Sequence, residues 1–266
     1  MIDTDTKLRI GTSGWSFDDW VGRFYSAETT KRDMFARYVQ HFRTVEVNYT
    51  YYRMPAARTF ASLSSKSPPG FDFWVKANQD ITHRQQTDPI APFCDALSPL
   101  LQDKQLAGVL LQFPQGFHRT VANRRFLATA LAGFAERLGL PSASLAVEFR
   151  HASWDHPDTT AGLTDRGHTL VIPDVPDIAA LYRVAPQATS EIGYLRLHSR
   201  NAGTWYAGAA ERYDYHYDTG ELRRIAEQWQ TTAAGLEKVY VLFNNCHHAQ
   251  AANNAQDFRC VVEELA

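Results

Sequence analysis

Short runs of β-branched and aromatic residues alternate along this chain with longer stretches whose apolar residues recur at helical spacing. The short runs, eight in all, are Lys7 to Trp15, Thr44 to Tyr52, Phe71 to Gln79, Leu106 to Pro114, Ser144 to Arg150, His168 to Asp174, Gly193 to Arg200 and Lys238 to Asn245. The helical stretches between them are Thr30 to Phe42, Ala56 to Lys66, Phe93 to Asp103, Asn123 to Leu138, Glu221 to Ala234 and Gln250 to Leu265, with weaker patterns over Asp158 to Arg166 and Asp177 to Arg183. A repeated strand and helix indicates parallel βα units.

Eight βα units close naturally into a barrel, and such barrels usually have about 250 residues, close to the 266 of this chain. The main competitor is a doubly wound open sheet that binds a nucleotide. Nucleotide-binding sheets carry glycine-rich motifs with a defined spacing of glycines or with a lysine. The segment Gly11 to Gly14 has neither that spacing nor the lysine. No linker, low-complexity tract or repeat divides the chain. We therefore predict an α/β fold, a TIM-like (β/α)8 barrel that forms a single domain over residues 1–266.

Polar residues alternate with apolar ones in the later half of several strands. Side chains alternate between the two faces of a strand, so Val45 and Val47 share one face while Glu46 and Asn48 share the other. The same split puts on the polar face Lys76, Asn78, Glu148, Arg150, Arg196, His198 and Asn244. A buried charge without a partner is costly, so these groups are expected to meet one another or a ligand. We predict that they converge at the carboxyl-end mouth of the barrel, where barrel enzymes build their sites; the alternative is a buried ion-pair network that is structural only.

The overall charge restricts the classes of partner. The chain has 27 Lys and Arg against 29 Asp and Glu, a net charge of -2, which argues against a surface that grips nucleic acid or anionic lipid as a whole. The cysteines, Cys94, Cys246 and Cys260, are odd in number and far apart, so neither a disulfide framework nor a structural zinc site is indicated. The segment from Met1 to Arg9 lacks the apolar run of a signal peptide, and we expect a cytoplasmic protein without a membrane partner.

Cations outnumber carboxylates among the residues predicted at the mouth. Lys76, Arg150 and Arg196 face only Glu46 and Glu148, so the expected partner is an anionic small molecule, a carboxylate or phosphate ester. Further substrate-binding candidates are Asn48, Asn78, Gln112 and Asn244, which offer neutral hydrogen bonds, and Trp15 and Trp154, which offer stacking surfaces.

The same residues suggest catalysis. His198, Glu46 or Glu148 would act as a general base, while Lys76 or an arginine would stabilise developing negative charge. The catalytic candidates are therefore Glu46, Lys76, Glu148 and His198, and the expected activity is that of a hydrolase or lyase. The sequence identifies no cofactor and no dedicated metal ligands, and it gives no indication of the oligomeric state.

Three alternatives stay open. Glu46, Glu148, Asp174 and His198 suit a divalent metal, which would make the protein a metal-dependent phosphodiesterase or nuclease-like enzyme, although the interleaved cations compete for the carboxylates. In a glycosidase Glu46 and Glu148 would form the catalytic pair, but the neighbouring cations would hold both ionised. The third is a non-catalytic module for an anion or nucleic acid, suggested by the aromatic and basic segment Arg212 to Tyr217; we prefer to interpret this segment as a loop that caps the barrel mouth.

Several strings in order along nearly the whole chain resemble the YecE-like family, domain of unknown function 72. They are Ile10-Gly-Thr-Ser-Gly-Trp15, Thr44-Val-Glu-Val-Asn48 with Tyr51-Tyr52-Arg53, Val75-Lys76-Ala77 with Ile81-Thr82-His83, Gln112-Phe-Pro114, Val147-Glu-Phe-Arg-His-Ala-Ser-Trp154, Leu195-Arg-Leu-His198 and Phe243-Asn-Asn245. The resemblance implies a (β/α)8 barrel and no established activity. The chain departs from the family pattern at Tyr49, Ser199 and Ala249, the last of which stands where a glycine is expected.

Overall fold

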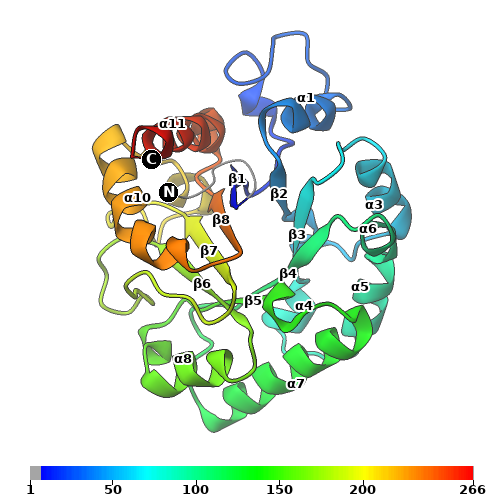
Figure 1. Ribbon diagram of the computed structural model, residues 1–266, viewed down its shortest axis with the longest axis vertical. Helices are drawn as coiled ribbons and strands as arrows, with labels where there is room; N and C mark the ends of the chain where they lie inside the picture. The colour runs from blue at the N-terminus through cyan, green and yellow to red at the C-terminus, as the bar shows by residue number, and fades with distance from the viewer. Residues whose placement is uncertain (1–6, 266) are drawn as a thin grey trace.

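A computed structural model describes residues 7–265 of the chain and shows one sheet of eight parallel strands. The strands follow one another around the sheet in the order β1-β8-β7-β6-β5-β4-β3-β2 (Figure 1). They are β1 (Leu8–Thr12), β2 (Thr44–Val47), β3 (Asp72–Lys76), β4 (Leu106–Gln112), β5 (Leu145–Glu148), β6 (Thr169–Asp174), β7 (Ile192–Leu197) and β8 (Lys238–Phe243). All eight predicted strands are present, and the prediction of a TIM-like barrel is confirmed.

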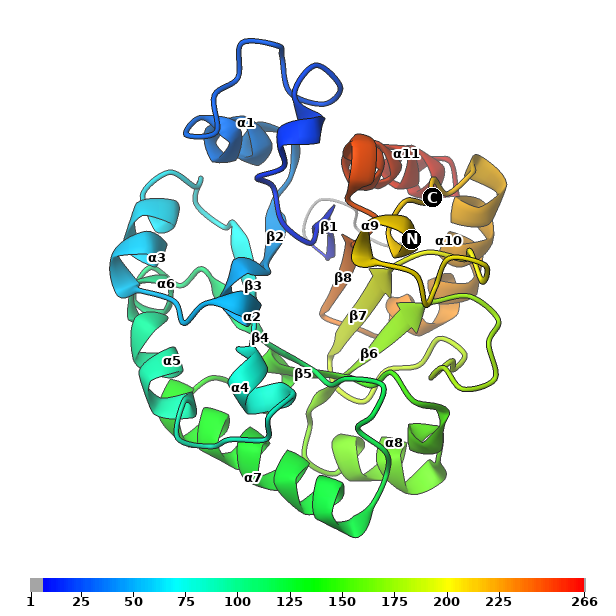
Figure 2. The same cartoon turned by 180° about the vertical axis from the view of Figure 1, so that it is seen from behind.

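Helices surround the strands as an outer ring (Figures 1 and 2). The ring consists of α1 (Met34–His41), α3 (Ala57–Ser64), α5 (Ile90–Ala96), α6 (Ser98–Gln102), α7 (Val121–Leu138), α8 (Pro157–Thr164), α10 (Thr219–Ala234) and α11 (Gln250–Leu265). Short helices follow the carboxyl ends of strands, namely α2 (Tyr49–Tyr52), α4 (Gln79–Thr82) and α9 (Ala209–Arg212). Among the described residues, no helix is both long enough and apolar enough to cross a membrane.

Two of the predicted helical stretches differ from the structure. Phe93 to Asp103 spans the end of α5 and all of α6, because the chain turns at Leu97 and α6 begins at Ser98, with Pro99 in its first turn. The prediction of a helix over Asp177 to Arg183 is wrong, because this segment is a loop between β6 and β7. Its backbone groups bond to the segment after β5 instead: Tyr182 N donates to Arg150 O at 3.1 Å, and Ala180 O accepts from Ala152 N at 3.0 Å.

The barrel closes at β1 and β2 through a side chain. Within residues 7–265 no backbone ladder joins these two strands, which end the sheet order. The buried Tyr38 hydroxyl instead accepts from Thr12 N and donates to Thr44 O, both at 3.0 Å. Gly11 permits the close approach, since a Cβ there would lie 2.4 Å from Thr44 O. The sheet is therefore a nearly closed barrel with a bridged seam.

Mostly large side chains fill the lower half of the barrel interior, the half nearer the amino ends of the strands. The buried interior cluster is Trp74, Leu110, Ala146, Val171, Tyr194, Tyr240 and Leu242. Trp74 packs against Tyr194 and Tyr240, with ring centroids 4.7 and 5.3 Å apart. The alternate residues Val45, Val47 and Val75 belong to the other core, between the sheet and the helices. The predicted alternation of side chains between the two faces of each strand is confirmed. The polar residues at the carboxyl ends of the strands lie directly above the interior cluster, which we call the apolar floor.

Candidate active site at the barrel mouth

A buried ionic layer rests directly on that apolar floor. Arg196 of β7 binds Glu46 of β2 through two hydrogen bonds, with Nε to Oε2 at 2.8 Å and Nη2 to Oε1 at 2.6 Å. Arg196 Nη1 also donates to Glu148 Oε2 at the end of β5. The three side chains are at most 1% exposed. We call Glu46, Arg196 and Glu148 the lower layer.

The lower layer satisfies its own charges. The Tyr194 hydroxyl donates to Glu46 Oε2 at 2.6 Å, which adds a bond to the carboxylate that Arg196 holds. Burial alone would raise the pKa of Glu148, but Arg150 and Arg196 outweigh it and hold that pKa well below its usual value. Burial likewise disfavours the charged form of Arg196, and the two glutamates reverse this and raise its pKa well above the usual value. Glu148 and Arg196 are therefore both ionised.

His198 lies beside Glu148 and is neutral. Its Nδ1 lies 3.0 Å from Asn244 Nδ2, and its Nε2 lies 3.3 Å from both Glu148 Oε1 and Arg150 Nη2. Burial, followed by the positive charge of Arg150, lowers the pKa of His198 to about 3. The imidazole orients its neighbours but carries no charge at neutral pH.

Lys76 lies above the lower layer, at the end of β3, in a different setting. Its Nζ donates to Gln112 Oε1 at 2.7 Å and stands 4.4 Å from the centre of the Tyr51 ring. Among the described residues it has no carboxylate partner, in contrast to Lys238 at the opposite end of the barrel, which binds Asp72 at 2.9 Å. Burial, with the nearby Arg196 adding to it, lowers the pKa of Lys76 to about 7.

Two arginines lie near the indole of Trp205 in the same region. Arg150 Nε lies 2.5 Å from Glu148 Oε1, and its guanidinium stands 5.8 Å from the centre of the Trp205 ring. Arg212 stands 5.3 Å from that ring and donates from Nε to Trp205 O at 2.6 Å. No described carboxylate forms an ion pair with Arg212. These contacts hold both guanidiniums in place and leave some of their N–H donors available to a ligand.

A cavity of about 290 Å³ opens above these groups. Its lining comes from the loops after β2, β3, β4, β5, β6 and β7, and it consists of Tyr51, Tyr52, Lys76, His83, Gln112, Pro114, Gln115, Arg150, Leu181, Trp205, Arg212 and Tyr213. This lining includes three cationic side chains and no Asp or Glu. We call Lys76, Arg150 and Arg212 the upper layer.

The structure divides the predicted site residues between the cavity and its surroundings. Lys76, Gln112 and Arg150 line the cavity, whereas Glu46, Glu148, Arg196, His198 and Asn244 lie outside its lining. Asn48 donates from Nδ2 to Ser13 O at 3.3 Å across the seam, and Asn78 caps α4 by accepting from Asp80 N at 3.0 Å. Neither asparagine is part of the lining.

The two predicted stacking tryptophans pack within the protein. Trp154 is 2% exposed, stacks on Phe149 with centroids 4.1 Å apart, and donates to Phe117 O at 2.5 Å. Trp15 is partly buried and packs against Phe35 at 5.1 Å. Neither lines the cavity, and the indole that does is Trp205.

Nine lining residues were not among the predicted site residues: Tyr51, Tyr52, His83, Pro114, Gln115, Leu181, Trp205, Arg212 and Tyr213. All nine lie beyond the ends of the strands, in loops or in the short helices α2 and α9, where strand parity gives no signal. Trp205, Arg212 and Tyr213 do belong to the aromatic and basic region that we expected to cap the mouth, and the structure places them there. Tyr51 and His83 lie within the strings that carry the family resemblance.

The carboxylates considered for a metal site are occupied by arginines. Asp174 binds Arg200 with Nη2 to Oδ2 at 2.6 Å and accepts from the Tyr217 hydroxyl at 2.8 Å. Glu46 and Glu148 share Arg196. Across residues 7–265, no group of three or more His, Cys, Asp or Glu side chains is arranged to hold a metal ion.

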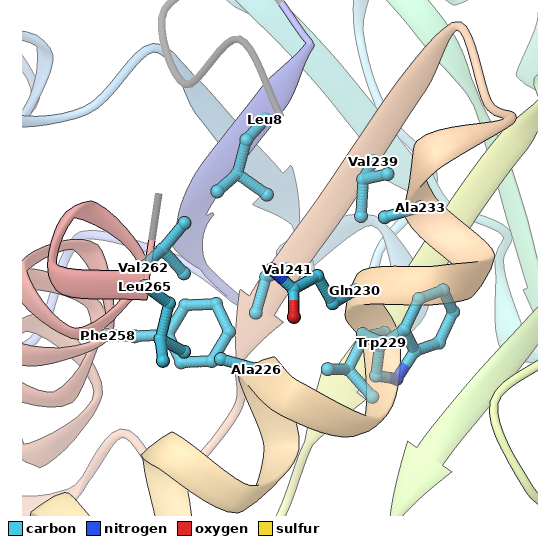
Figure 3. A pocket seen from close by; sticks show the side chains of 11 residues that line it. Leu8, Ala226, Trp229, Gln230, Ala233, Val239, Val241, Phe258, Val262 and Leu265 are labelled. Carbon is cyan, nitrogen blue, oxygen red and sulfur yellow. The ribbon is translucent and has the colours of Figure 1, made fainter. Parts of the chain in front are cut away.

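An apolar groove lies outside the barrel between α10 and α11 (Figure 3). Its walls include Trp229, Val241 and Phe258, with Gln230 as a polar member. It offers no titratable group, so the barrel mouth is the better candidate for chemistry.

The loop after β8 keeps an unusual backbone despite its sequence. His248 and Ala249 have φ values of 52° and 63°, in the left-handed region that favours glycine. Ala249 is the position where the family pattern has glycine, so the alanine adopts the conformation that a glycine would reach more easily. The loop is held by His248 N, which donates to Asp19 Oδ2 at 2.7 Å, and by Cys246 O, which accepts from Trp20 Nε1 at 2.7 Å.

Comparisons with known proteins agree on the family. A family model described as protein of unknown function DUF72 matches residues 9–265. The UPF0759 protein YunF of Bacillus subtilis (strain 168) is 29% identical over 269 residues, covering 94% of this chain and 92% of that protein. The crystal structure of a DUF72 family protein from Thermotoga maritima MSB8 matches with a TM-score of 0.88 and 34% identity, covering 97% of this chain and 99% of that one. One from Enterococcus faecalis V583 matches with a TM-score of 0.83 and 26% identity, covering 96% and 95%. The chain therefore belongs to the DUF72 family of uncharacterised proteins.

Proposed function

We propose that this protein is an enzyme that binds an anionic small molecule in the cavity at the barrel mouth and acts on it as a lyase. The observation that carries the proposal is the upper layer: Lys76, Arg150 and Arg212 line one small cavity that has no carboxylate in its lining. A carboxylate or phosphate group is the partner that such a set of donors would recognise.

The charge balance supports an anionic ligand. In the buried part of the site, Glu46 and Glu148 are offset by Arg196 and Arg150, and His198 is neutral. Lys76 and Arg212 then remain without a carboxylate among the described residues. A bound anion would supply the missing negative charge, in a cavity whose aromatic walls reduce the screening by water.

The lower layer would act by positioning. Glu148 binds Arg196 through Oε2 and Arg150 through Oε1, so it links the buried network to a guanidinium that lines the cavity. Glu46 and Arg196 hold that carboxylate in place from below. These residues touch no part of the cavity, and we assign them to the orientation of Arg150.

A lyase fits the lining better than a hydrolase. The Lys76 amine has a pKa of about 7, so near neutral pH it can take up or release a proton. The lining contains no carboxylate, serine or cysteine, and a hydrolase would have only the weakly basic His83, with a pKa of about 4, to activate water. Acid–base or covalent chemistry centred on an amine is therefore the chemistry that these residues favour.

Calorimetric titration tests the anion site. We expect wild-type protein to bind inorganic phosphate or pyruvate, and Arg212→Gln to weaken binding about tenfold, or ~1.4 kcal/mol. Arg125→Gln, on the exposed surface of α7, serves as the matched control and should bind as the wild type does. Affinity unchanged by Arg212→Gln, or no binding of either anion by the wild type, would refute the proposal.

A further inference from the structure

The setting of Lys76 is that of a reactive amine and not of a structural cation. Its Nζ has one hydrogen-bond acceptor, Gln112 Oε1 at 2.7 Å, and the face of Tyr51 at 4.4 Å. An ammonium group carries three donors, so this environment leaves at least one of them aimed at neither partner. A structural role would normally bring a carboxylate to such a group, and the described residues provide none.

The surrounding charges favour the neutral form of this amine. Burial lowers the pKa of Lys76 most, and the positive charges of Arg196 and Arg150 lower it further. Glu46 and Glu148 raise this pKa, but both carboxylates are also paired with those arginines. The pKa of about 7 means that a large fraction of Lys76 is unprotonated at neutral pH. A desolvated lysine beside other cations is the usual way in which proteins make an amine nucleophilic.

The remaining lining suits a substrate that is anionic at one end and carries a carbonyl at the other. Arg150 and Arg212 both line the cavity, with their guanidiniums 5.8 and 5.3 Å from the centre of the Trp205 ring, where they can receive a carboxylate or phosphate. The cavity volume of about 290 Å³ limits the ligand to a small molecule. Such a ligand would present its other end to Lys76.

We propose, building on the proposed function, that Lys76 Nζ forms a covalent imine with the carbonyl carbon of a small 2-oxo acid or ketose phosphate. The shared chemistry is a ketone or aldehyde that carries a carboxylate or phosphate group. The structure thereby assigns Lys76 as the nucleophile of this site and Arg150 and Arg212 as the anion clamp.

The step balances without any further reagent. The Nζ lone pair forms a bond to the carbonyl carbon, and the oxygen takes one proton from the nitrogen and a second from solvent before it leaves as water. The product is a protonated imine that bears one positive charge and one hydrogen on nitrogen. The anionic group of the substrate offsets this charge, which the empty site disfavours through Arg150 and Arg196.

The imine then serves as the electron acceptor of a lyase reaction. When a bond to the carbon next to the imine breaks, its electron pair forms the C=C bond of an enamine while the π pair of the C=N bond moves onto nitrogen and neutralises it. In an aldol cleavage, the hydroxyl of the departing fragment gives up its proton as it becomes a carbonyl. His83 lines the cavity and can accept that proton. Thr82 Oγ1 donates to Asn78 O at 3.4 Å and so receives a hydrogen from His83 Nδ1 at 2.9 Å, which leaves Nε2 free of a proton. Burial, with Lys76 and Arg150, lowers the pKa of His83 to about 4 and keeps it neutral.

Borohydride trapping tests the proposal directly. Full-length protein is incubated at neutral pH with pyruvate or with dihydroxyacetone phosphate, reduced with sodium borohydride, digested, and mapped by mass spectrometry. We expect a reduced adduct on the peptide that contains Lys76 with at least one of the two probes; the arm that reacts identifies a carboxylate or a phosphate as the preferred anion. Lys76→Arg keeps a cation and should abolish the adduct, whereas Lys66→Arg, an exposed lysine after α3, should not change it.

Calorimetry with inorganic phosphate on the same samples separates the two proposals. If phosphate binds and no adduct forms on Lys76 with either probe, the imine is refuted while the anion site stands. An adduct spread equally over Lys66 and Lys76 also refutes it, because the amine would then have no special reactivity. If neither phosphate nor either probe binds, both proposals fail. Folding of Lys76→Arg is checked by circular dichroism. Should it not fold, the adduct on Lys76 is compared between the wild type and Arg212→Gln, and an equal amount of adduct in a variant that binds phosphate more weakly would overturn the anion clamp.

Discussion

Two ionic layers lie one above the other inside this barrel and differ in how their charges are used. In the lower layer, Arg196 is held by Glu46 and Glu148, and each group is at most 1% exposed. In the upper layer, Lys76 and Arg212 line a cavity and have no carboxylate partner among the described residues. Charged residues from different strands and loops thus form a closed network below and an unbalanced set of cations above.

The difference teaches that charge at a barrel mouth is not by itself a sign of a binding site. A network that pairs every charge stabilises geometry, and breaking it is costly because an unpaired charge stays buried. A set of cations that lacks its counter-charge instead has affinity for a ligand that brings one. Glu148 connects the two layers, since it holds Arg196 on one side and Arg150 on the other.

The largest predicted effect comes from breaking the lower layer. Arg196→Met leaves Glu46 and Glu148 buried without their shared partner, and we expect the free energy of unfolding to fall by about 3 to 5 kcal/mol in urea denaturation. Arg212→Gln in the upper layer should change it by less than about 0.5 kcal/mol. A loss below about 1 kcal/mol for Arg196→Met would show that the lower layer does not hold the barrel together.

A smaller effect follows from the pH dependence of stability. His198 binds a proton in the unfolded chain at its ordinary pKa of 6.5, whereas the folded pKa is about 3, so stability falls as the pH drops from 6.5 toward 3. At pH 5 this single group accounts for ~2 kcal/mol. His83, His151 and His168 also have lowered pKa values and contribute to the same slope.

The control for this prediction is His198→Gln, which removes one titrating group and retains a hydrogen-bonding side chain. Denaturant titrations at pH 7 and pH 5 should show a smaller difference in the variant than in the wild type. Equal differences would mean that His198 takes up its proton in the folded protein as readily as in the unfolded one.

The sequence predicted the strands and the inward polar face well, because both follow from a two-residue period that the barrel enforces locally. It predicted less about which residues form the buried network and which line the cavity. The alternation of side chains places both Glu46 and Lys76 on the inward face and does not say which of them lies with Arg196 in the buried network. Residues beyond the strands were harder still: the segment after β7 brings Trp205 and Arg212 into the lining of the cavity. Asn78 illustrates the reverse error of strand reasoning, because β3 ends at Lys76 and the asparagine caps α4.

The titration of Lys76 tests the central claim most directly. Lysine labelled with ¹³C at the ε carbon can be followed by NMR from pH 5 to pH 11, and the signal assigned by its absence in Lys76→Met. The account predicts a midpoint near 7 for this lysine in the ligand-free protein. A midpoint near the ordinary lysine value of 10.5 would show that the amine is a fully solvated or fully paired cation, and the upper layer would then lose its proposed chemistry.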